Sequence, residues 1–428
     1  MSRIENLVDR LNAPDKKDRL SALSELCRLF DNGEIKRPDT ADDVNNHIHT
    51  TYSFSPYSPT KAVWMAYNAG LKTAGIMDHD SVGGVDEFTE AGKTVGIMTT
   101  IGVECRVKMH NTPLAGKRIN NPDQKSIAYI ALHGIPHQYV GQVRDFFTPY
   151  TAARIERGRR MTERINDLMA DFDISLDFDD DILPLSMAHD SGSVTERHIL
   201  FALSRKIIER FGKGEAVLNF LEKDLIIPIS SKVRSWLSDK GNTMYDYDLL
   251  GALKSDLVEK IYIDADTECP DVKEVLALSR EIGAISAYAY LGDVSQSVTG
   301  DKKTQTFEDG YLDLLFETLK TLGFNAVTYM PSRNTKKQLR AVRNLCDQYG
   351  LFQISGEDIN SPRQSFICLA QRDPEFAHLQ DAALALIGHE IAATNNVLEG
   401  MFSERTIKRI PDLSNRIKHF KSLASIRK

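Results

Sequence analysis

The sequence has few cysteines, no long apolar run and no excess of basic residues. Its five cysteines form no CxxC pair, which argues against a disulfide framework and favours reduced thiols. No apolar stretch approaches the roughly 18 residues of a membrane span, and the first residues lack the basic and apolar regions of a signal peptide. The net charge of -7 disfavours a broadly basic nucleic-acid surface but is compatible with a local basic patch. These absences predict a cytoplasmic protein with no membrane partner.

The 428 residues are enough for two domains or for one large barrel with an insertion. Leucine-rich helical periodicity covers residues 1–40, and short strands alternate with helices from residue 44. The alternation breaks at about residues 150–255 and resumes near residue 272. Strands are expected at residues 45–50, 72–77, 95–103, 127–132, 284–289, 326–330 and 351–355. This order predicts an α/β protein with a parallel sheet or barrel.

Two short histidine-containing clusters follow the first two expected strands. His47 and His49 are two residues apart, so both side chains point to one face of a strand and can bind one ion. Asp78, His79 and Asp80 follow the next apolar run and reach the same edge. Because strand ends carry the active site in α/β barrels, the clusters predict metal-dependent hydrolysis.

The spacing of four motifs resembles the PHP (polymerase and histidinol phosphatase) superfamily. They are HIHTTYS at residues 47–53, GIMDHDS at 75–81, GVE at 102–104 and GEDIN at 356–360. The resemblance implies a distorted (β/α)7 TIM-like barrel that hydrolyses phosphoesters at its C-terminal rim. It also implies a helical lid, formed here by the insertion.

With this fold, the chain is expected to divide into five segments. They are an N-terminal helical extension (1–43), the first part of the PHP barrel (44–150), a mostly helical lid insertion (151–270), the second part of the barrel (271–372) and a C-terminal helical extension (373–428).

The resemblance implies that His47, His49, Glu104 and Asp358 bind a first metal ion. His79 matches a ligand of a third ion, and either Tyr129 or His133 matches a ligand of the second. Imidazole and carboxylate ligands suit manganese, zinc or iron. The metal ligands are therefore predicted as His47, His49, His79, Glu104, His133 and Asp358.

Three positions depart from the family pattern. Phe54 stands where an aspartate is expected, Asn360 replaces the late histidine, and Tyr290 replaces a histidine after the strand at residues 284–289. We therefore expect one or two ions instead of three. Tyr290 is either a phenolate ligand, a proton donor or a space-filling residue.

His79 and Asp80 are the candidate catalytic residues, as carriers of a proton. Arginines bind phosphate through two parallel hydrogen bonds, and the candidates for substrate binding are Arg106, Arg197, Arg333 and Arg363. The arginine-rich run at residues 154–164 is expected to form a solvated helix face.

The leading hypothesis is a metal-dependent phosphoesterase that uses metal-activated water on a small phosphorylated substrate. The alternative is a degenerate PHP barrel that keeps one metal ion and acts as a non-catalytic ligand-binding or regulatory protein. A metal hydrolase of non-phosphate bonds is a third possibility. The negative net charge and the lid favour a small substrate. A nucleic-acid substrate is the less favoured alternative.

Overall fold

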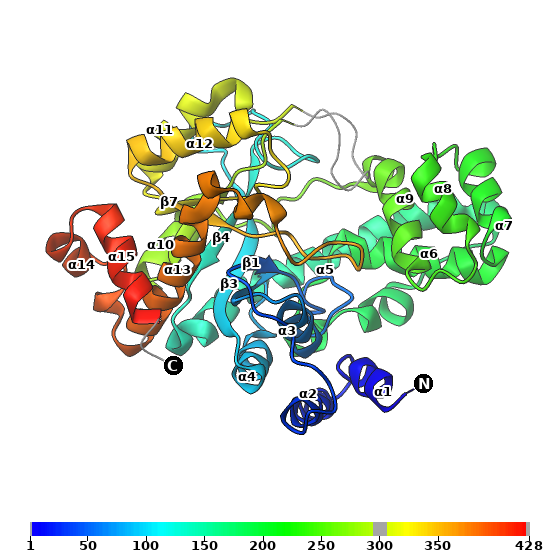
Figure 1. Cartoon of the computed structure of the whole chain (residues 1–428). Helices are drawn as coiled ribbons and strands as arrows, with labels where there is room; N and C mark the ends of the chain where they lie inside the picture. Colours follow the sequence, from blue (N-terminus) through cyan, green and yellow to red (C-terminus); the bar gives the residue numbers. More distant parts are fainter. Residues whose placement is uncertain (1, 294–305, 425–428) are drawn as a thin grey trace.

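The chain folds around a barrel of seven strands with helices outside it (Figure 1). The structure is a computed structural model, and it describes residues 2–293 and 306–424. The strands are neighbours in chain order, which confirms the predicted distorted seven-stranded barrel. They are β1 (Val44–Ile48), β2 (Thr73–His79), β3 (Met98–Lys108), β4 (Ile127–His133), β5 (Ile285–Ala289), β6 (Ala326–Tyr329) and β7 (Phe352–Ser355).

Amphipathic helices connect most of the strands and cover the outside of the barrel. In α10, the Asp271 side chain caps the helix in a capping box with Glu274, and Gly283 ends the helix at a φ of 73°. The buried apolar side chains of α10 face the barrel core. The barrel helices are α3 (Pro59–Asn68), α4 (Val85–Val95), α10 (Val272–Ile282), α11 (Leu312–Leu322) and α12 (Lys336–Tyr349).

Strand β4 runs antiparallel to both of its neighbours, β3 and β5, whereas the other pairs are parallel. The sequence analysis expected parallel neighbours throughout. The segment between β3 and β4 has no helix in the structure, and a connection without a crossover helix suits an antiparallel pair. As a consequence, the start of β4 lies at the rim where the parallel strands end.

Strand β1 contacts the segment after β7 and so closes the barrel. The His49 amide donates to the Ile359 carbonyl at 3.0 Å, and the Ile359 amide donates to the His47 carbonyl at 3.1 Å. Asn46, buried in β1, donates from its side chain to the Ser355 carbonyl at 2.9 Å. This closure brings the end of β1 beside Asp358.

The insertion forms a helical lid that projects to one side of the barrel, on the right in Figure 1. Its helices pack around a hydrophobic cluster of their own, which also takes in Phe54 from the barrel. The lid helices are α5 (Val140–Met169), α6 (Glu196–Phe211), α7 (Glu215–Asn219), α8 (Ser231–Ser238) and α9 (Tyr245–Ile261).

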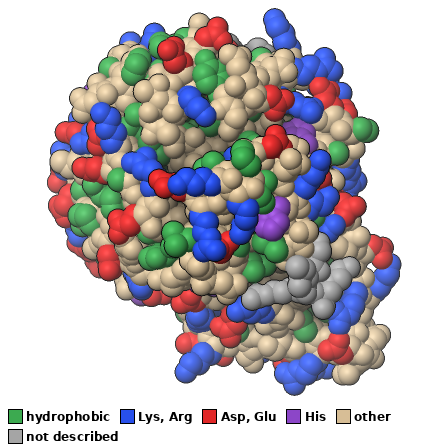
Figure 2. Space-filling view, turned by 90° about the vertical axis from the view of Figure 1, so that its left-hand side faces the viewer, with side chains coloured by type: hydrophobic (Ala, Val, Ile, Leu, Met, Phe, Trp, Pro, Cys, Tyr) green, Lys and Arg blue, Asp and Glu red, His purple; other side chains and the backbone are tan. Residues whose placement is uncertain are grey.

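The terminal helices pack on opposite parts of the barrel. Helices α1 (Arg3–Arg10) and α2 (Lys16–Asp31) lie near α3 and α4, where buried Arg19 pairs with buried Glu87 at 2.5 Å. Helix α13 (Ala377–Asn395) packs against β7 and α15 (Leu413–Ala424), with α14 (Glu404–Arg409) close by. On the side of the molecule that carries these C-terminal helices, basic and acidic side chains are mixed (Figure 2).

The arginine-rich part of α5 is not a uniformly solvated face, so this prediction is wrong for Arg154 and Arg157. Both side chains are buried, because this stripe of α5 faces buried carboxylates, whereas Arg160 and Arg164 are exposed. Within the described residues, we find no helix with the length and apolar character needed to span a bilayer.

Candidate metal centre

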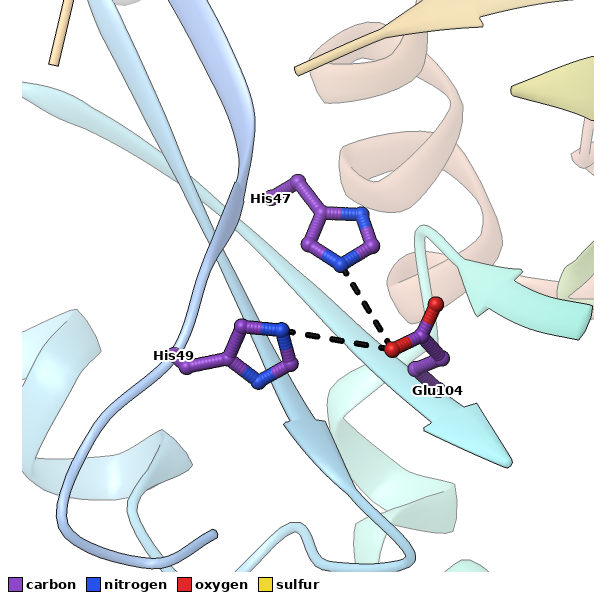
Figure 3. Close-up of side chains that lie close together, drawn as sticks. All are labelled: His47, His49 and Glu104. Carbon is purple, nitrogen blue, oxygen red and sulfur yellow. Dashed lines mark ion pairs between the residues drawn. The ribbon is translucent and has the colours of Figure 1, made fainter. Parts of the chain in front are cut away.

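Strand ends bring His47, His49 and Glu104 together at one rim of the barrel (Figure 3). His47 lies in β1, His49 directly follows it, and Glu104 lies in β3. The Nε2 atoms of His47 and His49 lie 3.7 Å and 3.9 Å from Oε2 of Glu104. Asp358 joins from the segment after β7, with its Oδ1 at 3.2 Å from His49 Nε2.

The hydrogen bonds around His49 leave its Nε2 atom free to bind a cation. Ser53 Oγ donates to Asp78 at 2.6 Å, so it accepts the Nδ1 proton of His49 at 3.2 Å. The buried Nε2 then carries a lone pair, has no hydrogen-bond donor, and faces two carboxylates. Burial lowers the pKa of His49, which favours this neutral form. A bound cation would accept the lone pair of His49 Nε2 and balance the charge of the two carboxylates at the same time.

The two carboxylates are kept ionised in spite of their burial. Burial would raise the pKa of Glu104, but the nearby His47 and His79 hold it well below its usual range. Asp358 shows the same balance between its burial, which raises the pKa, and neighbouring basic side chains, which lower it. Two imidazoles and two carboxylates fit Mn, Fe or Zn, so the residues present suit the first metal position.

His79 adjoins this group, whereas Asp80 turns away from it. The register of β2 and β3 places His79 opposite Glu104, and His79 Nδ1 lies 3.1 Å from Glu104 Oε2. Asp80 has a left-handed φ of 51° and pairs with Arg154 at 2.8 Å. The described part of the cavity is lined by His79 and Arg154 but not by Asp80. Asp80 therefore acts on the site through Arg154.

The direction of β4 separates Tyr129 from His133. In the antiparallel register, Tyr129 pairs with Arg106 near the rim and His133 pairs with Gly102 deeper in the barrel. Tyr129 lines the cavity, with its ring centre 6.0 Å from that of His79. His133 is buried, and its Nε2 has no hydrogen-bond partner among the described residues. Tyr129 thus lies closer to the open side of the centre, and the ligand role of His133 stays a prediction.

A cavity of about 240 Å³ opens over the candidate metal ligands. The lid contributes Arg154, Thr195, Arg197 and Val258 to its wall, and the barrel contributes aromatic and polar residues. Arg197 makes no hydrogen bond or ion pair with any described residue. Burial has the largest effect on the pKa of Asp358, and the positive charge of Arg197 is among the influences that lower this pKa. The structure therefore places beside the centre a guanidinium that has no hydrogen bond or ion pair within the described part of the chain.

The other three arginine candidates lie outside the cavity wall. Arg106 is buried and pairs with Glu268 and, at 3.2 Å, with Glu196. Arg333 donates from Nε to the Leu291 carbonyl at 3.2 Å. The guanidinium of Arg363 pairs with Asp248 at 2.5 Å and stacks on Trp236 at 3.9 Å. Their predicted contact with substrate has no support from this placement.

Arg154 is the cavity residue that the sequence analysis missed. It is one of five arginines within eleven residues of α5. Its spacing of three from Arg157 is a helical signal for one shared face, but nothing in the sequence marks that face as buried. Only the position of Asp80 and the lid in space identifies it.

Three buried histidines predict a pH-dependent stability. Burial lowers the pKa of His133 and His198 to about 3 and that of His389 to about 4. An unfolded histidine has a pKa of about 6.5, so between pH 6.5 and 4 the unfolded chain binds protons that the folded chain does not. The free energy of unfolding should therefore fall with falling pH, by about 1.4 kcal/mol per unit for each histidine.

Urea unfolding at pH 7, 6 and 5 measures this slope. The matched variant is His389→Gln, because His389 lies against Gly134, far along the chain from the metal-binding motifs. The variant should lose less stability between pH 7 and pH 5 than the wild type. Equal slopes for the two proteins would contradict the assignment of His389 as a neutral buried group.

Two solved structures resemble most of the chain at low similarity. A proposed metal-dependent phosphoesterase from Bifidobacterium adolescentis is 18% identical, with a TM-score of 0.49 over 81% of this chain and 98% of that one. An amidohydrolase from Chromobacterium violaceum, with bound sulfate and no metal, is 15% identical, with a TM-score of 0.48 over 76% of this chain and 90% of that one.

A curated protein of Haemophilus influenzae, a 5'-3' exoribonuclease, is 43% identical over 58 residues. That segment is 14% of this chain, and it spans about a fifth (21%) of the length of the relative. The sequence pattern of the PHP domain family matches a much longer part of this chain, residues 45–326. These residues contain most of the barrel and the entire lid, and the chain therefore belongs to the PHP domain family.

Proposed function

We propose that this protein is a metal-dependent phosphoesterase that acts on a small phosphorylated substrate. The observation that carries the proposal is the presence, in one cavity, of a candidate metal-binding group and of the Arg197 guanidinium, which makes no ion pair with any described residue. A divalent ion at this group supplies Lewis acidity and an activated water. Arg197 and Arg154 supply positive charge for the phosphate oxygens.

The protein's own residues divide the remaining work. Ser53 and Asp78 hold the imidazole of His49 in one orientation. Asp80 holds Arg154 at the cavity wall. Phe54, Tyr129 and Val258 narrow the cavity with apolar or aromatic surface, which restricts water around the substrate. In this scheme His79 carries a proton at the cavity wall, as the sequence analysis predicts. Asp80, the second predicted catalytic residue, positions Arg154 instead.

The size of the site favours a small substrate. The cavity of about 240 Å³ lies just below the usual range of ligand sites. The H. influenzae relative is an exoribonuclease, so nucleotides and short oligonucleotides belong in the test panel beside sugar phosphates and generic aryl phosphates.

The test is turnover of this panel by protein loaded with Mn, Zn or Fe. The proposal predicts phosphate release that stops when a chelator removes the metal. Failure to release phosphate from any ester, together with ligand-induced thermal stabilisation, would instead support the non-catalytic alternative. Hydrolysis of amide or lactone substrates alone would support the third hypothesis.

Arg197→Ala should weaken the Michaelis complex. Removal of a charged hydrogen bond to phosphate costs roughly 1.5–3 kcal/mol, so we expect kcat/KM to fall about 10–150-fold. Arg205→Ala, on the same helix and outside the cavity wall, is the matched control. An unchanged kcat/KM for Arg197→Ala would remove Arg197 from the substrate site.

A further inference from the structure

The atoms able to bind a cation converge at one point of the cavity. Within the described residues, His47, His49 and Glu104 form the group whose ligand atoms all lie within 4.8 Å of one another, and Asp358 adjoins it. We propose that the chain binds one divalent cation per molecule, although the family resemblance implies a larger cluster. This inference concerns the number of cations and holds whether or not the protein is a phosphoesterase.

The position of Phe54 is closed by the core of the lid. Phe54 is 6% exposed, and its ring centre lies 5.0 Å from that of His198 and 5.8 Å from that of Phe201. Both partners belong to α6. The side chain thus anchors the lid to the barrel at a place where an aspartate would otherwise offer oxygen, and its apolar surroundings disfavour an ion.

Asn360 directs its amide group at the metal-binding carboxylate. Its Nδ2 donates to Asp358 Oδ1 at 2.5 Å. An amide NH2 group carries two donors and no lone pair for a metal. In this orientation Asn360 supports Asp358 as a ligand, and it does not contribute a ligand to another ion.

The two tyrosines of the cavity wall are also poor ligands. The Tyr290 hydroxyl donates to Asp309 Oδ1 at 2.6 Å, and burial together with this bond raises its pKa far above its usual value. Burial has the same effect on the pKa of Tyr129. The Tyr290 hydroxyl is thus engaged with Asp309, and the phenolate role considered for Tyr290 has no support.

Besides the proton-carrying role proposed above, His79 supports Glu104 through its Nδ1 atom. Its Nδ1 lies at hydrogen-bond distance, 3.1 Å, from Glu104 Oε2. An N–H donated to a ligating carboxylate fixes the orientation of that carboxylate. Because Phe54 and Asn360 stand in place of an aspartate and a histidine, His79 lacks the partners needed for a separate ion.

Metal counting tests the proposal directly. Protein stripped with a chelator is reloaded with Mn²⁺ or Zn²⁺, freed of excess metal by gel filtration and measured by mass spectrometry of the elements. Titration with Co²⁺, followed by its visible absorption, gives an independent count. We expect about one ion per chain by both methods. Two or more ions per chain, or no retained ion, would overturn the proposal.

Variants locate the ion without relying on turnover. His49→Ala should lose the bound ion, whereas Tyr290→Phe and Phe54→Leu should keep one ion with a Kd within about twofold of the wild type. His79→Ala should keep one ion and raise the Kd about 10–100-fold, as expected for an outer-shell partner. A loss of bound metal in Tyr290→Phe, or a fall from two ions to one in His79→Ala, would contradict the proposal.

Discussion

Replacement of His49 with alanine is expected to reduce phosphoester turnover by roughly 10³-fold or more. A metal ion contributes several kcal/mol of transition-state stabilisation, and each 1.36 kcal/mol is a factor of ten in rate. His49 is 1% exposed and lies next to both carboxylates of the group. Its loss removes a predicted ligand, and the neighbouring Ser53 and Asp78 side chains are engaged with each other.

The measurement is kcat/KM for the best substrate in the panel, together with the metal content of each protein. His110→Ala is the matched control, because His110 is exposed and lies outside the cavity wall. The control should keep its metal and its activity. Full activity in metal-free His49→Ala would show that turnover does not depend on this centre.

Replacement of Arg154 with methionine should affect both stability and substrate binding. Arg154 is 5% exposed, pairs with buried Asp80 at 2.8 Å and lines the cavity. Removing one partner of a buried ion pair leaves an uncompensated charge and costs about 3–5 kcal/mol. We therefore expect a loss of this size in the free energy of unfolding and a higher KM for the phosphoester.

Chemical denaturation and steady-state kinetics test this prediction, with two comparison variants. Arg159→Met, on the same helix in a partly exposed pair with Asp179, should leave the free energy of unfolding nearly unchanged. The double variant Asp80→Asn/Arg154→Met should recover part of the lost stability, because it removes both charges, but it should not recover the KM. Recovery of both would show that Arg154 has only a structural role.

The barrel could be predicted because its signals are local. The β2 strand has an apolar run that ends at Met77, directly before Asp78, and α10 has a capping box and a terminal glycine. Each such segment contains enough information to identify its own element. The orientation of β4 could not be read in the same way, because it depends on the path of the connection between β3 and β4.

The proximity of the four candidate metal ligands was also predictable, since they lie at or just after the ends of predicted strands. His47, His49, Glu104 and Asp358 are far apart in sequence, but barrel geometry gathers strand ends at one rim. Their assignment as ligands remains a prediction until a metal is observed. The structure adds the support around them, such as the bond from Ser53 to Asp78.

The arginines show where sequence reasoning failed. Arg106 and Arg363 follow predicted motifs, but each guanidinium forms an ion pair with a buried or half-buried carboxylate from a distant segment. Arg154 was assigned to solvent, yet it lines the cavity. The difference depends on how the lid packs on the barrel, and this packing joins residues more than 70 positions apart, such as Asp80 and Arg154.

Anomalous X-ray diffraction from crystals of the metal-loaded protein tests the central claim most directly. Data collected on either side of the metal's absorption edge would identify the ion and locate it in one experiment. The account predicts one anomalous peak per chain, within roughly 2.0–2.3 Å of His47 Nε2, His49 Nε2 and an oxygen of Glu104 or Asp358. The absence of a peak at this point, or the strongest peak at another place on the chain, would contradict it.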